Sequence, residues 1–543
     1  RFKCDWSSDV CSSDLGGGLM QLVAYGAQDV YLTGQPQITY FKVVYRRHTN
    51  FSVEPIQQTF QGNAEFGRTI TCNVNRNGDL ITNMYLVAKI KQPTRSTWGW
   101  VNKLGYAMIE NVKVEVGGSK IDEQYGDWLN VWNELTRNTS QDRANDAMIG
   151  NVDALTSMKG TQSDDEYTLY VPLQFWFNRN NGLALPLIAL QYHDIRVSLK
   201  LRCADELVNY TSASVPSGVT DDLMKDAYLL IDYIYLDAEE RKRFAQAAHE
   251  YLIEQVQFTG DETWNSTSAK YRLNFNHPSK YLVWNTCSSK YQEKGQYIDW
   301  AFDGDWKAAK DRAAKKLFLA TRKTIEKNGG AYSISFDDST IEIGDQENQA
   351  QNVSANTVLT ALLGKIDAQL LFAGSGNDAD ATLENVVVLR NELTDADMAT
   401  LVSALTATGI NTQGKNFLEA NQVTVRDYFN YSTSANCTGN PVTKAKLQLN
   451  GHDRFSERDG NYFNYVQPYQ HFTCTPCDGI NVYSFALKPE DHQPSGTCNF
   501  SRIDNTTLNL SLVSGLTGTV KIYCVNYNVF RVMSGMGGLA YSN

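Results

Sequence analysis

The residues best suited to chemistry in this 543-residue chain are two closely spaced cysteines. Cys474 and Cys477 form a Cys-x-x-Cys motif, His471 lies just before it, and Cys498 follows further along the chain. A structural zinc ion takes four such ligands, usually arranged as two pairs. Because no second pair accompanies the motif, the pattern favours a loop with two free thiols over a metal site. A thioredoxin-like role would need a β-α context that the flanking sequence lacks.

Histidines are the next candidates, because imidazole serves in both catalysis and metal binding. A catalytic histidine needs a nucleophile and an orienting acid nearby. Neither that constellation nor a Gly-x-Ser-x-Gly elbow is recognisable. The run His452-Asp453-Arg454, with Glu457 and Arg458, indicates instead a polar network near a domain edge or a subunit contact. We expect hydrogen-bonded structural roles for the five histidines in patterned segments: His48, His193, His277, His452 and His492.

Glycine-rich and acidic stretches complete the candidates. Gly16–Gly18 and Ser534–Gly538 lack the Walker spacing with its Lys-Ser/Thr pair, so they do not predict a phosphate site. The second stretch suits a tight turn after the last strand. The acidic runs Asp164–Glu166 and Asp337–Asp338 offer cation ligands, but such runs are usually solvated loops. The sequence therefore predicts no catalytic, cofactor-binding or metal-binding residue, and no enzyme.

The elements that must position these residues are mostly strands. The chain has 29 Tyr and 22 Phe residues, and aromatic and β-branched side chains suit a pleated, half-buried surface. The residues Tyr40–Tyr45 predict an extended strand, and Pro55 favours an edge or a turn. Alternation predicts further strands, for example at Glu110–Val116. Apolar residues at helical spacing predict a short helix at Tyr125–Thr136.

These strands fall into two blocks. The first block covers residues 16–238, and a charged helical linker at residues 239–250 belongs to a helix-like run that reaches Glu254. The second block covers residues 251–543. Many short strands separated by turn signals predict a sandwich or a barrel. The expected fold is mainly β, with two tandem antiparallel sandwiches and short helices, and no internal sequence repetition between the two halves is recognisable.

The second block contains an insertion at about residues 290–440, where the texture of the sequence changes. Asp305–Arg322 and Leu393–Gly409 are helix-like, whereas Ala331–Ile343 alternates like a hairpin. This pattern predicts an α/β insertion with a small core of its own.

Charge and cysteine content narrow the classes of function. The net charge of −11 disfavours a protein whose main task is gripping nucleic acid, and no sequence-specific nucleic-acid contact is expected. The ten cysteines are irregularly spaced in a long chain, which is not typical of a disulfide scaffold. No apolar run is long enough for a transmembrane helix, and the chain does not open on a secretory signal. These features predict a soluble protein made in a reducing compartment.

Long stretches in both blocks resemble the major capsid proteins of nucleocytoplasmic large DNA viruses, especially those of algal and giant viruses. Examples are YGDWLNVWNELT within residues 120–136, LYVPLQFWF within 169–195 and HDRFSERDGNYFNYV within 445–470. Other stretches that carry the resemblance are residues 21–51, 233–260, 273–284, 483–505 and 527–543.

The resemblance implies a double jelly roll whose trimers form pseudo-hexagonal capsomers in the icosahedral shell of a large double-stranded DNA virus. It implies a protein of the virion, made in the host cytoplasm, without a cofactor. Its partners would be itself, neighbouring capsomers and minor capsid proteins. The insertion at residues 290–440 matches no family pattern. Since exposed loops tolerate insertions, we expect it on the exterior, with host contact among its candidate tasks.

Two other functions remain as alternatives: a jelly-roll attachment protein that binds a glycan or a receptor, and a transient scaffold protein. Each would use the same kind of fold with a different partner. An enzyme on a jelly roll would need clustered carboxylates or a metal triad, and the sequence offers neither.

The first fifteen residues have a different origin in this interpretation. The stretch DWSSDVCSSDL at residues 5–15 closely resembles the translation of a sequencing-library adapter, and the capsid resemblance begins only after it. We therefore expect residues 1–15 to be foreign to the protein, with native residues from Gly16 onward. In that case Cys4 and Cys11 do not belong to its cysteines.

Overall fold

The computed structural model describes most of the chain outside its first residues and the insertion. It divides into two units, residues 1–50 and residues 51–543. The described residues are 20, 22, 25–93, 98–156, 166–210, 215–289, 426–434 and 437–541, with the backbone of six short strands between 322 and 389. The stretch predicted to be foreign, residues 1–15, lies outside them.

The first unit has little regular structure in its described part. Only α2 (Val30–Thr33) is helical in the part from Tyr25 onward, and Tyr40, Phe41 and Tyr45 are more than four-fifths exposed. The strand predicted for Tyr40–Tyr45 is therefore wrong. Aromatic and β-branched composition is permissive for a strand, but a strand also needs a partner, and none of the described strands pairs with this segment.

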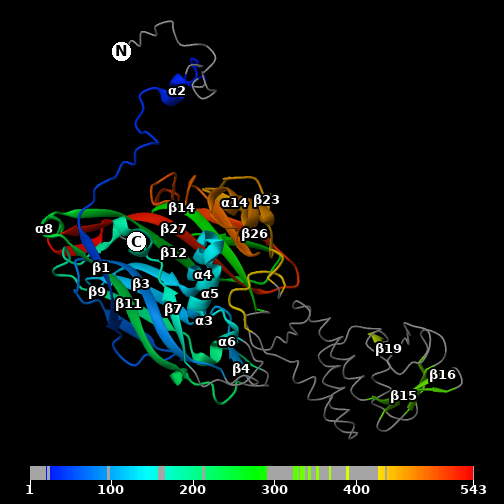
Figure 1. The fold of residues 1–543 in the computed structure, drawn as a ribbon. Coiled ribbons are helices and arrows are strands. Elements are labelled where there is room, and N and C mark those ends of the chain that lie inside the picture. Colours follow the sequence, from blue (N-terminus) through cyan, green and yellow to red (C-terminus); the bar gives the residue numbers. More distant parts are fainter. Residues whose placement is uncertain are drawn as a thin grey trace, which may run out of the picture. The chain divides into compact units, whose positions relative to one another are not determined.

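Two antiparallel sheets face each other in the first half of the second unit (Figure 1). One sheet has the order β1 (Phe51–Thr59), β11 (Met224–Leu236), β3 (Leu80–Lys91), β7 (Glu166–Pro172). The other has the order β2 (Thr69–Asn73), β9 (Ile195–Leu201), β5 (Ile109–Val116), β6 (Ser119–Tyr125). Pro55 lies on the edge strand β1, as predicted, because its missing N–H is tolerated there.

The second half repeats this arrangement. One sheet has the order β12 (His249–Trp264), β27 (Gly518–Met533), β14 (Pro278–Ser288), β24 (Ile480–Ser484). The other has the order β13 (Ser268–Arg272), β26 (Thr506–Leu512), β21 (Val442–Leu449), with the short strands β22 (His452–Asp453) and β23 (Arg458–Asp459) both on β21. The ordinal numbers used here leave out the short strands β4, β8, β10, β25 and β28 and the insertion, and take β22 and β23 as one strand. Counted in this way, the first strand of each half pairs with the last, the last with the third, and the third with the sixth. The predicted pair of tandem jelly rolls is confirmed.

Short elements fill the connections between these strands. The helices are α3 (Leu104–Ala107), α4 (Gly126–Thr136), α5 (Asp142–Ile149), α6 (Asp153–Thr156), α7 (Trp176–Arg179), α8 (Ala238–Gln246), the π-helix η7 (Tyr462–Val466) and α14 (Gln467–His471). The 3-10 turns are η1 (Thr139–Gln141), η2 (Asn181–Leu183), η3 (Ala204–Glu206), η4 (Asp221–Leu223) and η8 (Phe500–Arg502). The remaining strands are β4 (Trp98–Trp100), β8 (Leu185–Pro186), β10 (Val208–Tyr210), β25 (Cys498–Asn499) and β28 (Met536–Leu539). The helix predicted at Tyr125–Thr136 is α4.

The helix between the two jelly rolls is shorter than predicted. It ends at Gln246, and β12 begins at His249, so the interpretation of 239–254 as helical, and of 239–250 as a helical linker, is wrong after Gln246. The reason lies in pairing: residues 249–258 form a continuous ladder with β27 from His249↔Val532 to Phe258↔Tyr523. Tertiary pairing overrides the local helical preference of the charged residues.

The insertion interrupts the second jelly roll between β14 and β21. Its described strands are β15 (Arg322–Asn328), β16 (Ala331–Phe336), β17 (Thr340–Ile343), β18 (Ala350–Val353), β19 (Ile366–Ala368) and β20 (Val387–Leu389). Strands β16 and β17 pair antiparallel, which confirms the predicted hairpin. The helices predicted at residues 305–322 and 393–409 lie outside the described residues, except that Arg322 begins strand β15.

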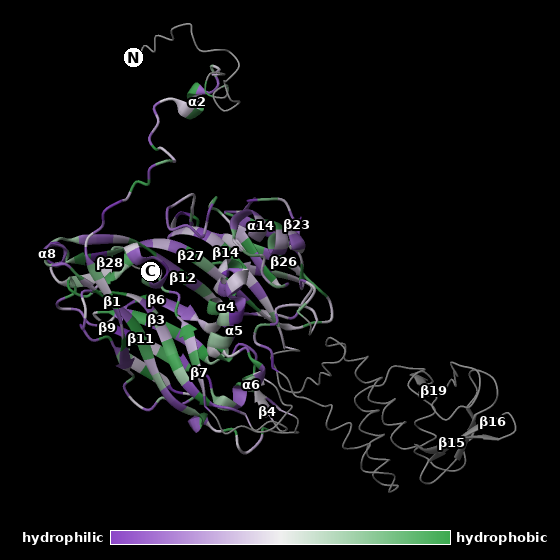
Figure 2. Cartoon of the chain, viewed as in Figure 1, coloured by the Kyte–Doolittle hydropathy of each residue, from purple (hydrophilic) through white to green (hydrophobic). Residues whose placement is uncertain are grey.

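The cores show how the two jelly rolls are joined. Alternate residues of β14 and β27 point to opposite faces of their sheet. Leu282 and Ile522 belong to the core of the second jelly roll, whereas Tyr281 and Tyr523 belong to the cluster of the first. Figure 2 shows the apolar stretches of these strands in green. The sheet β12-β27-β14-β24 is therefore covered on both faces. Among the described residues, no helix has the length and apolar character needed to cross a membrane.

Candidate functional site: the junction between the jelly rolls

Aromatic side chains form the centre of the junction. Trp128 of α4 lies with its ring centroid 5.4 Å from that of Tyr523 and 6.5 Å from that of Tyr281. Phe258 of β12 stacks on Tyr523, with 4.7 Å between the two ring centroids. Its centroid lies 4.8 Å from that of Tyr125. All come from strands or helices whose other face is in a core, so the rings are held in place from both sides. Offset and edge contacts of this kind add to the stabilisation from burial.

The edges of two sheets meet beside these rings. Asp122 of β6 accepts hydrogen bonds from the backbone N–H of Val256 at 3.1 Å and from the side chain of Gln124 at 3.1 Å. The amide of Gln255 in turn donates to the carbonyl oxygen of Ile121. Side chains thus satisfy the backbone groups of two edge strands, which prevents further pairing. Burial raises the pKa of Asp122 from 3.8 to about 6, although these donors oppose the shift.

A second polar group joins α4 to β27. Lys521 makes an ion pair with Asp127, and the same carboxylate accepts a hydrogen bond from the Tyr431 hydroxyl at 3.0 Å. Burial would lower the pKa of Lys521, but the attraction of Asp127 raises it above the ordinary lysine value. Asn130 donates to the Tyr431 hydroxyl as well, at 3.4 Å. Tyr431 belongs to the segment that returns from the insertion, so three parts of the chain meet here.

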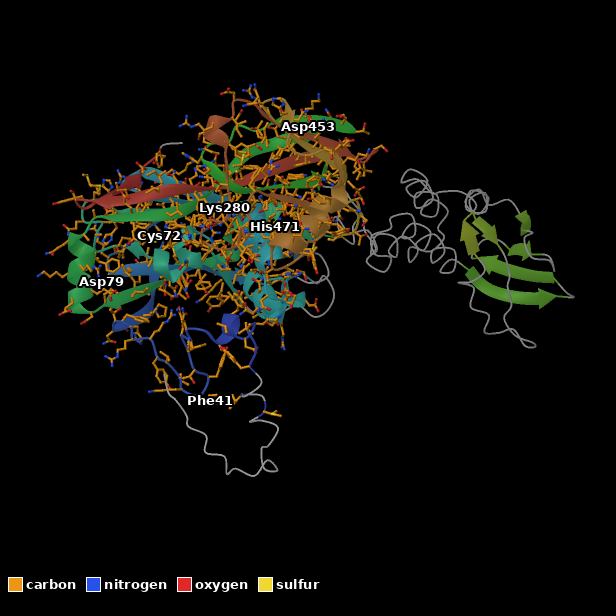
Figure 3. All side chains as sticks on the ribbon, turned by 90° about the horizontal axis from the view of Figure 1, so that it is seen from above. Phe41, Cys72, Asp79, Lys280, Asp453 and His471 are labelled. Atoms are coloured by element: carbon orange, nitrogen blue, oxygen red, sulfur yellow. The ribbon has the colours of Figure 1, made fainter. Side chains whose placement is uncertain are left out.

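The third polar group surrounds Glu254 of β12. Lys280 has no exposed side-chain surface, and its Nζ lies 2.7 Å from one oxygen of Glu254; Arg179 lies 3.1 Å from the other. Figure 3 shows Lys280 in the interior of the molecule. Burial would raise the pKa of Glu254, but Arg179, His492 and Lys280 lower it to about 2. The group is therefore a carboxylate at all ordinary pH values, held by several donors.

A cavity of about 470 Å³ opens beside Glu254. The guanidinium of Arg179 lies 4.5 Å from the ring centroid of Trp132, a cation–π contact across the cavity wall. The residues that line this cavity come from both jelly rolls and include Trp132, Trp176, Arg179, Asn180, Glu254 and His492. The junction thus contains a polar cleft beside an apolar seam.

The Cys-x-x-Cys motif binds the end of α4. The backbone N–H of Cys474 donates to Leu135 at 3.0 Å, and the Cys477 thiol donates to Glu134 at 3.3 Å. His471 contacts the carbonyl oxygen of Leu487, and Cys498 lies on β25. Across the described residues, no group of three or more His, Cys, Asp or Glu side chains is placed to hold a metal ion. His471, Cys474, Cys477 and Cys498, which were weighed as zinc ligands from the sequence, are therefore not arranged as a metal site.

The histidines occupy separate places. His193 bonds Gly537 through Nδ1 at 2.9 Å, His492 lies 3.8 Å from Glu254, and His48 contacts Thr49 in the first unit. His277 is buried with a positive φ of 66°, and its backbone N–H donates to Ser501. His452 lies exposed on β22. The five histidines thus lie in different parts of the described chain and form no shared site.

The polar run after β21 forms a network at the edge of a sheet. Asp453 accepts hydrogen bonds from Lys446 at 3.2 Å and Gln448 at 2.8 Å. Arg458 lies 5.1 Å from the ring centroid of Tyr462. Asp453 lies at the periphery of the molecule in Figure 3. The glycine-rich stretch Ser534–Gly538 turns between β27 and β28, with φ values of 52° at Ser534 and 79° at Gly535. The predicted tight turn is confirmed.

The remaining candidates lie partly outside the described residues. Glu166 begins β7, whereas Gly16–Gly18, Asp164–Asp165 and Asp337–Asp338 are outside the described part. The junction residues Asp122, Asp127, Glu254, Lys280 and Lys521 were not singled out from the sequence. The only local signal was a charged residue inside an apolar strand, for example Lys280 before Tyr281-Leu282-Val283.

The insertion leaves from the second jelly roll, and the first described residues of its return limb contact the first jelly roll. Ser289, after β14, donates from its backbone N–H to Thr517 at 2.9 Å. On the return side, the backbone N–H of Arg426 donates to Asn209 at 2.8 Å, and the Tyr428 hydroxyl donates to Glu206 at 2.9 Å. Both limbs are thus fixed to the body, one on each half.

Comparison with known proteins agrees with this architecture. The model of the family "Major capsid protein N-terminus" matches residues 39–237, and that of "Large eukaryotic DNA virus major capsid protein" matches residues 240–538. The boundary between the two matches falls at the start of α8. Together these matches cover both jelly rolls.

Individual relatives match over nearly the whole chain. The major capsid protein of Phaeocystis pouchetii virus is 43% identical, and capsid protein 1 of Acanthamoeba polyphaga mimivirus is 41% identical; in both cases 97% of this chain and 100% of the relative are covered. The crystal structure of PBCV-1 VP54, fitted into a reconstruction of the virophage Sputnik, is 32% identical with a TM-score of 0.61, covering 93% of this chain and 100% of that one. The chain therefore belongs to the major capsid proteins of large eukaryotic DNA viruses, and its role is structural rather than enzymatic.

Proposed function

We propose that three copies of this chain form a capsomer with a pseudo-hexagonal outline, and that such capsomers tile the icosahedral shell of the virion. One observation carries the proposal: each chain consists of two jelly rolls with the same strand order, joined by a buried junction. Three chains of two similar blocks give six blocks in a ring. A contact between two different surfaces, repeated from copy to copy, forms a closed ring when the rotation between neighbouring copies adds up to a full turn.

The apolar surface of the single chain supports self-association. Large exposed apolar patches on a soluble protein usually mark contact surfaces. In the second unit, Tyr469 is 82% exposed and Leu487 is 74% exposed. In the first unit, Tyr31, Tyr40 and Phe41 are 91–99% exposed. We propose neighbouring capsomers and minor capsid proteins as further partners, and the host cytoplasm as the site of synthesis.

The insertion at 290–440 is proposed to face the exterior and to contact the host surface. Support comes from its place in the fold: it replaces one loop of a jelly roll, and both of its limbs are fixed to the body. A chain in which residues 290–425 are replaced by a short Gly-Ser linker should still form capsomers and lose adsorption of particles to host cells. Particles that adsorb as well as the wild type would contradict the proposed host contact.

The oligomeric state tests the main proposal. Gel filtration with light scattering on the purified full chain should give three times the mass of one chain at micromolar concentration. A stable single chain at that concentration would overturn the trimer. Electron microscopy of the same sample should show the six-lobed outline.

A further inference from the structure

The two jelly rolls carry a short internal repeat that sequence inspection alone missed. The third strand contains Tyr-Leu-Val at Tyr85–Val87 in the first half and at Tyr281–Val283 in the second. Both copies pair with the last strand in the same register: Val87↔Tyr228 corresponds to Val283↔Tyr523, and Tyr85↔Leu230 to Tyr281↔Val525. Equal residue types at equal ladder positions define equivalent faces of the two sheets.

The helix after the fifth strand repeats as well. Gly126-Asp-Trp-Leu-Asn130 opens α4, and Gly460-Asn-Tyr-Phe-Asn464 leads into η7. Each glycine lies against the first residue of the fourth strand, where a Cβ would come within 2.3 Å of the Ile109 carbonyl oxygen or 1.8 Å of that of Val442. Leu129 and Phe463 are both fully buried. The two helical segments therefore occupy equivalent places.

The equivalent surfaces differ in what covers them. In the second jelly roll, Tyr281 and Tyr523 are at most 1% exposed, because Trp128 of α4 lies on them. In the first, Tyr85, Tyr228 and Leu230 are only partly buried, and Tyr170 on the neighbouring strand is 40% exposed. Figure 2 shows the hydrophobic residues of β3 and β11 in green.

The helical segments differ in the same way. On α4, Trp128 and Val131 are at most 1% exposed. On the segment Asn461–Tyr469, Tyr465 is 42% exposed and Tyr469 is 82% exposed. Each chain thus has one helical segment with exposed side chains and one sheet face with partly exposed side chains, and these are the counterparts of the two surfaces that meet in the buried junction.

We propose that the segment Asn461–Tyr469 of one copy packs on the outer face of the sheet β1-β11-β3-β7 of a second copy, as α4 packs on the sheet β12-β27-β14-β24 within the chain. This inference deepens the proposed capsomer and rests on it. Such a contact joins unlike surfaces, so it propagates around a ring until the ring closes.

The charges at the rim fit this contact. In the buried junction, Asp127 pairs with Lys521, which lies opposite Asn285 on β14. At the equivalent ladder position of the first jelly roll, Asp226 lies opposite Lys89. The helix residue equivalent to Asp127 is Asn461, which removes a second negative charge from the neighbourhood of Asp226. Because Asn461 is neutral, the helical segment can approach Asp226 without repulsion between two carboxylates. Such charge complementarity decides which surfaces can bind one another.

The test compares two substitutions on the helical segment with one elsewhere. The double variant Val466→Glu with Tyr469→Glu should have the mass of one chain by light scattering, with the circular dichroism spectrum of the wild type, because both residues are exposed in the single chain. Tyr465 is left unchanged because its hydroxyl donates to Asp478 at 2.7 Å. The control Tyr192→Glu changes another exposed tyrosine, which is 76% exposed, and should keep the mass of three chains. A double variant with the mass of three chains overturns this inference and leaves the capsomer standing. A wild-type chain with the mass of one chain overturns the capsomer itself.

Photo-crosslinking identifies the occupant of the sheet. With p-benzoylphenylalanine in place of Tyr469, and a mixture of isotopically light and heavy chains, cross-links should join different copies and fall within 80–91 or 224–236. Cross-links from Tyr469 to residues 25–50 would mean that the first unit covers the segment, and would overturn the inference.

Discussion

The two jelly rolls share a strand order and differ in what surrounds them. The sheet β12-β27-β14-β24 is covered on both faces, whereas the equivalent sheet of the first jelly roll has one apolar face partly open. The connection between the third and fourth strands spans residues 92–108 in the first half and residues 289–441 in the second. The same fold thus accommodates an incomplete interface in the first half, and a finished interface and a long insertion in the second.

This difference teaches that burial in the single chain identifies junctions already made, while exposure at an equivalent position identifies junctions still to be made. Val131 and Tyr465 occupy equivalent positions in the two helical segments, yet Val131 is fully buried whereas Tyr465 is 42% exposed. Substitutions at such pairs should therefore separate stability from association.

The largest expected effect follows from removing the central ring of the buried junction. Trp128→Ala should lower the free energy of unfolding by about 3–5 kcal/mol, because a large buried aromatic leaves a cavity. Tyr469→Ala in the equivalent segment should change it by less than about 0.5 kcal/mol in the single chain, because Tyr469 is 82% exposed. Chemical denaturation of both variants measures the difference. Equal losses would break the comparison between the two segments.

Charge removal should show a comparable contrast. Glu254→Gln leaves Lys280 and Arg179 buried without their carboxylate, and should cost about 3 kcal/mol. Glu54 on the first strand of the other jelly roll is exposed, so Glu54→Gln is the matched control with a change within about 0.5 kcal/mol. Urea unfolding at pH 7 provides the measurement. A wild-type-like stability of Glu254→Gln would show that the ion cluster does not hold the junction.

The smallest expected effect depends on pH. Because the pKa of Asp122 is raised from 3.8 to about 6 in the folded chain, the folded state binds its proton more tightly than the unfolded state. Its contribution to stability is present below pH 4 and is lost as the pH rises through 6; a shift of this size corresponds to at most about 3 kcal/mol. Asp122→Asn should remove this fall, whereas Asp232→Asn, a partly buried carboxyl on β11, should retain it. A fall of equal size in Asp122→Asn would exclude Asp122 as its source.

The sequence predicted the parts of the fold that depend on local patterns. Alternation identified β5 and the hairpin of β16 and β17, and helical spacing identified α4, because each pattern arises from one buried face. Tyr40–Tyr45 has the composition of a strand, and 247–254 follows a charged helix, so in both places pairing with distant strands decided the outcome. No local signal reports such a partner.

The junction was harder to predict for a related reason. Asp122 and Glu254 lie in strands where consecutive residues are buried, and nothing near them in the sequence distinguishes a polar residue that faces water from one that faces the other jelly roll. The internal repeat escaped notice because only a few letters, such as Tyr-Leu-Val, are shared. The repeat becomes recognisable only when both Tyr-Leu-Val segments are seen to pair with the last strand of their sheet in the same register.

Because both limbs of the insertion are fixed to the body, the sequence between them can vary independently of the surfaces that build the shell. Ser289 is held on the second jelly roll and Arg426 on the first, so the body already determines where the intervening segment leaves and returns. The segment between the limbs can therefore change in sequence or length while the surfaces that join neighbouring jelly rolls keep their shape. With the insertion in its proposed exterior position, a shell of this design can change what it displays without changing how it is built.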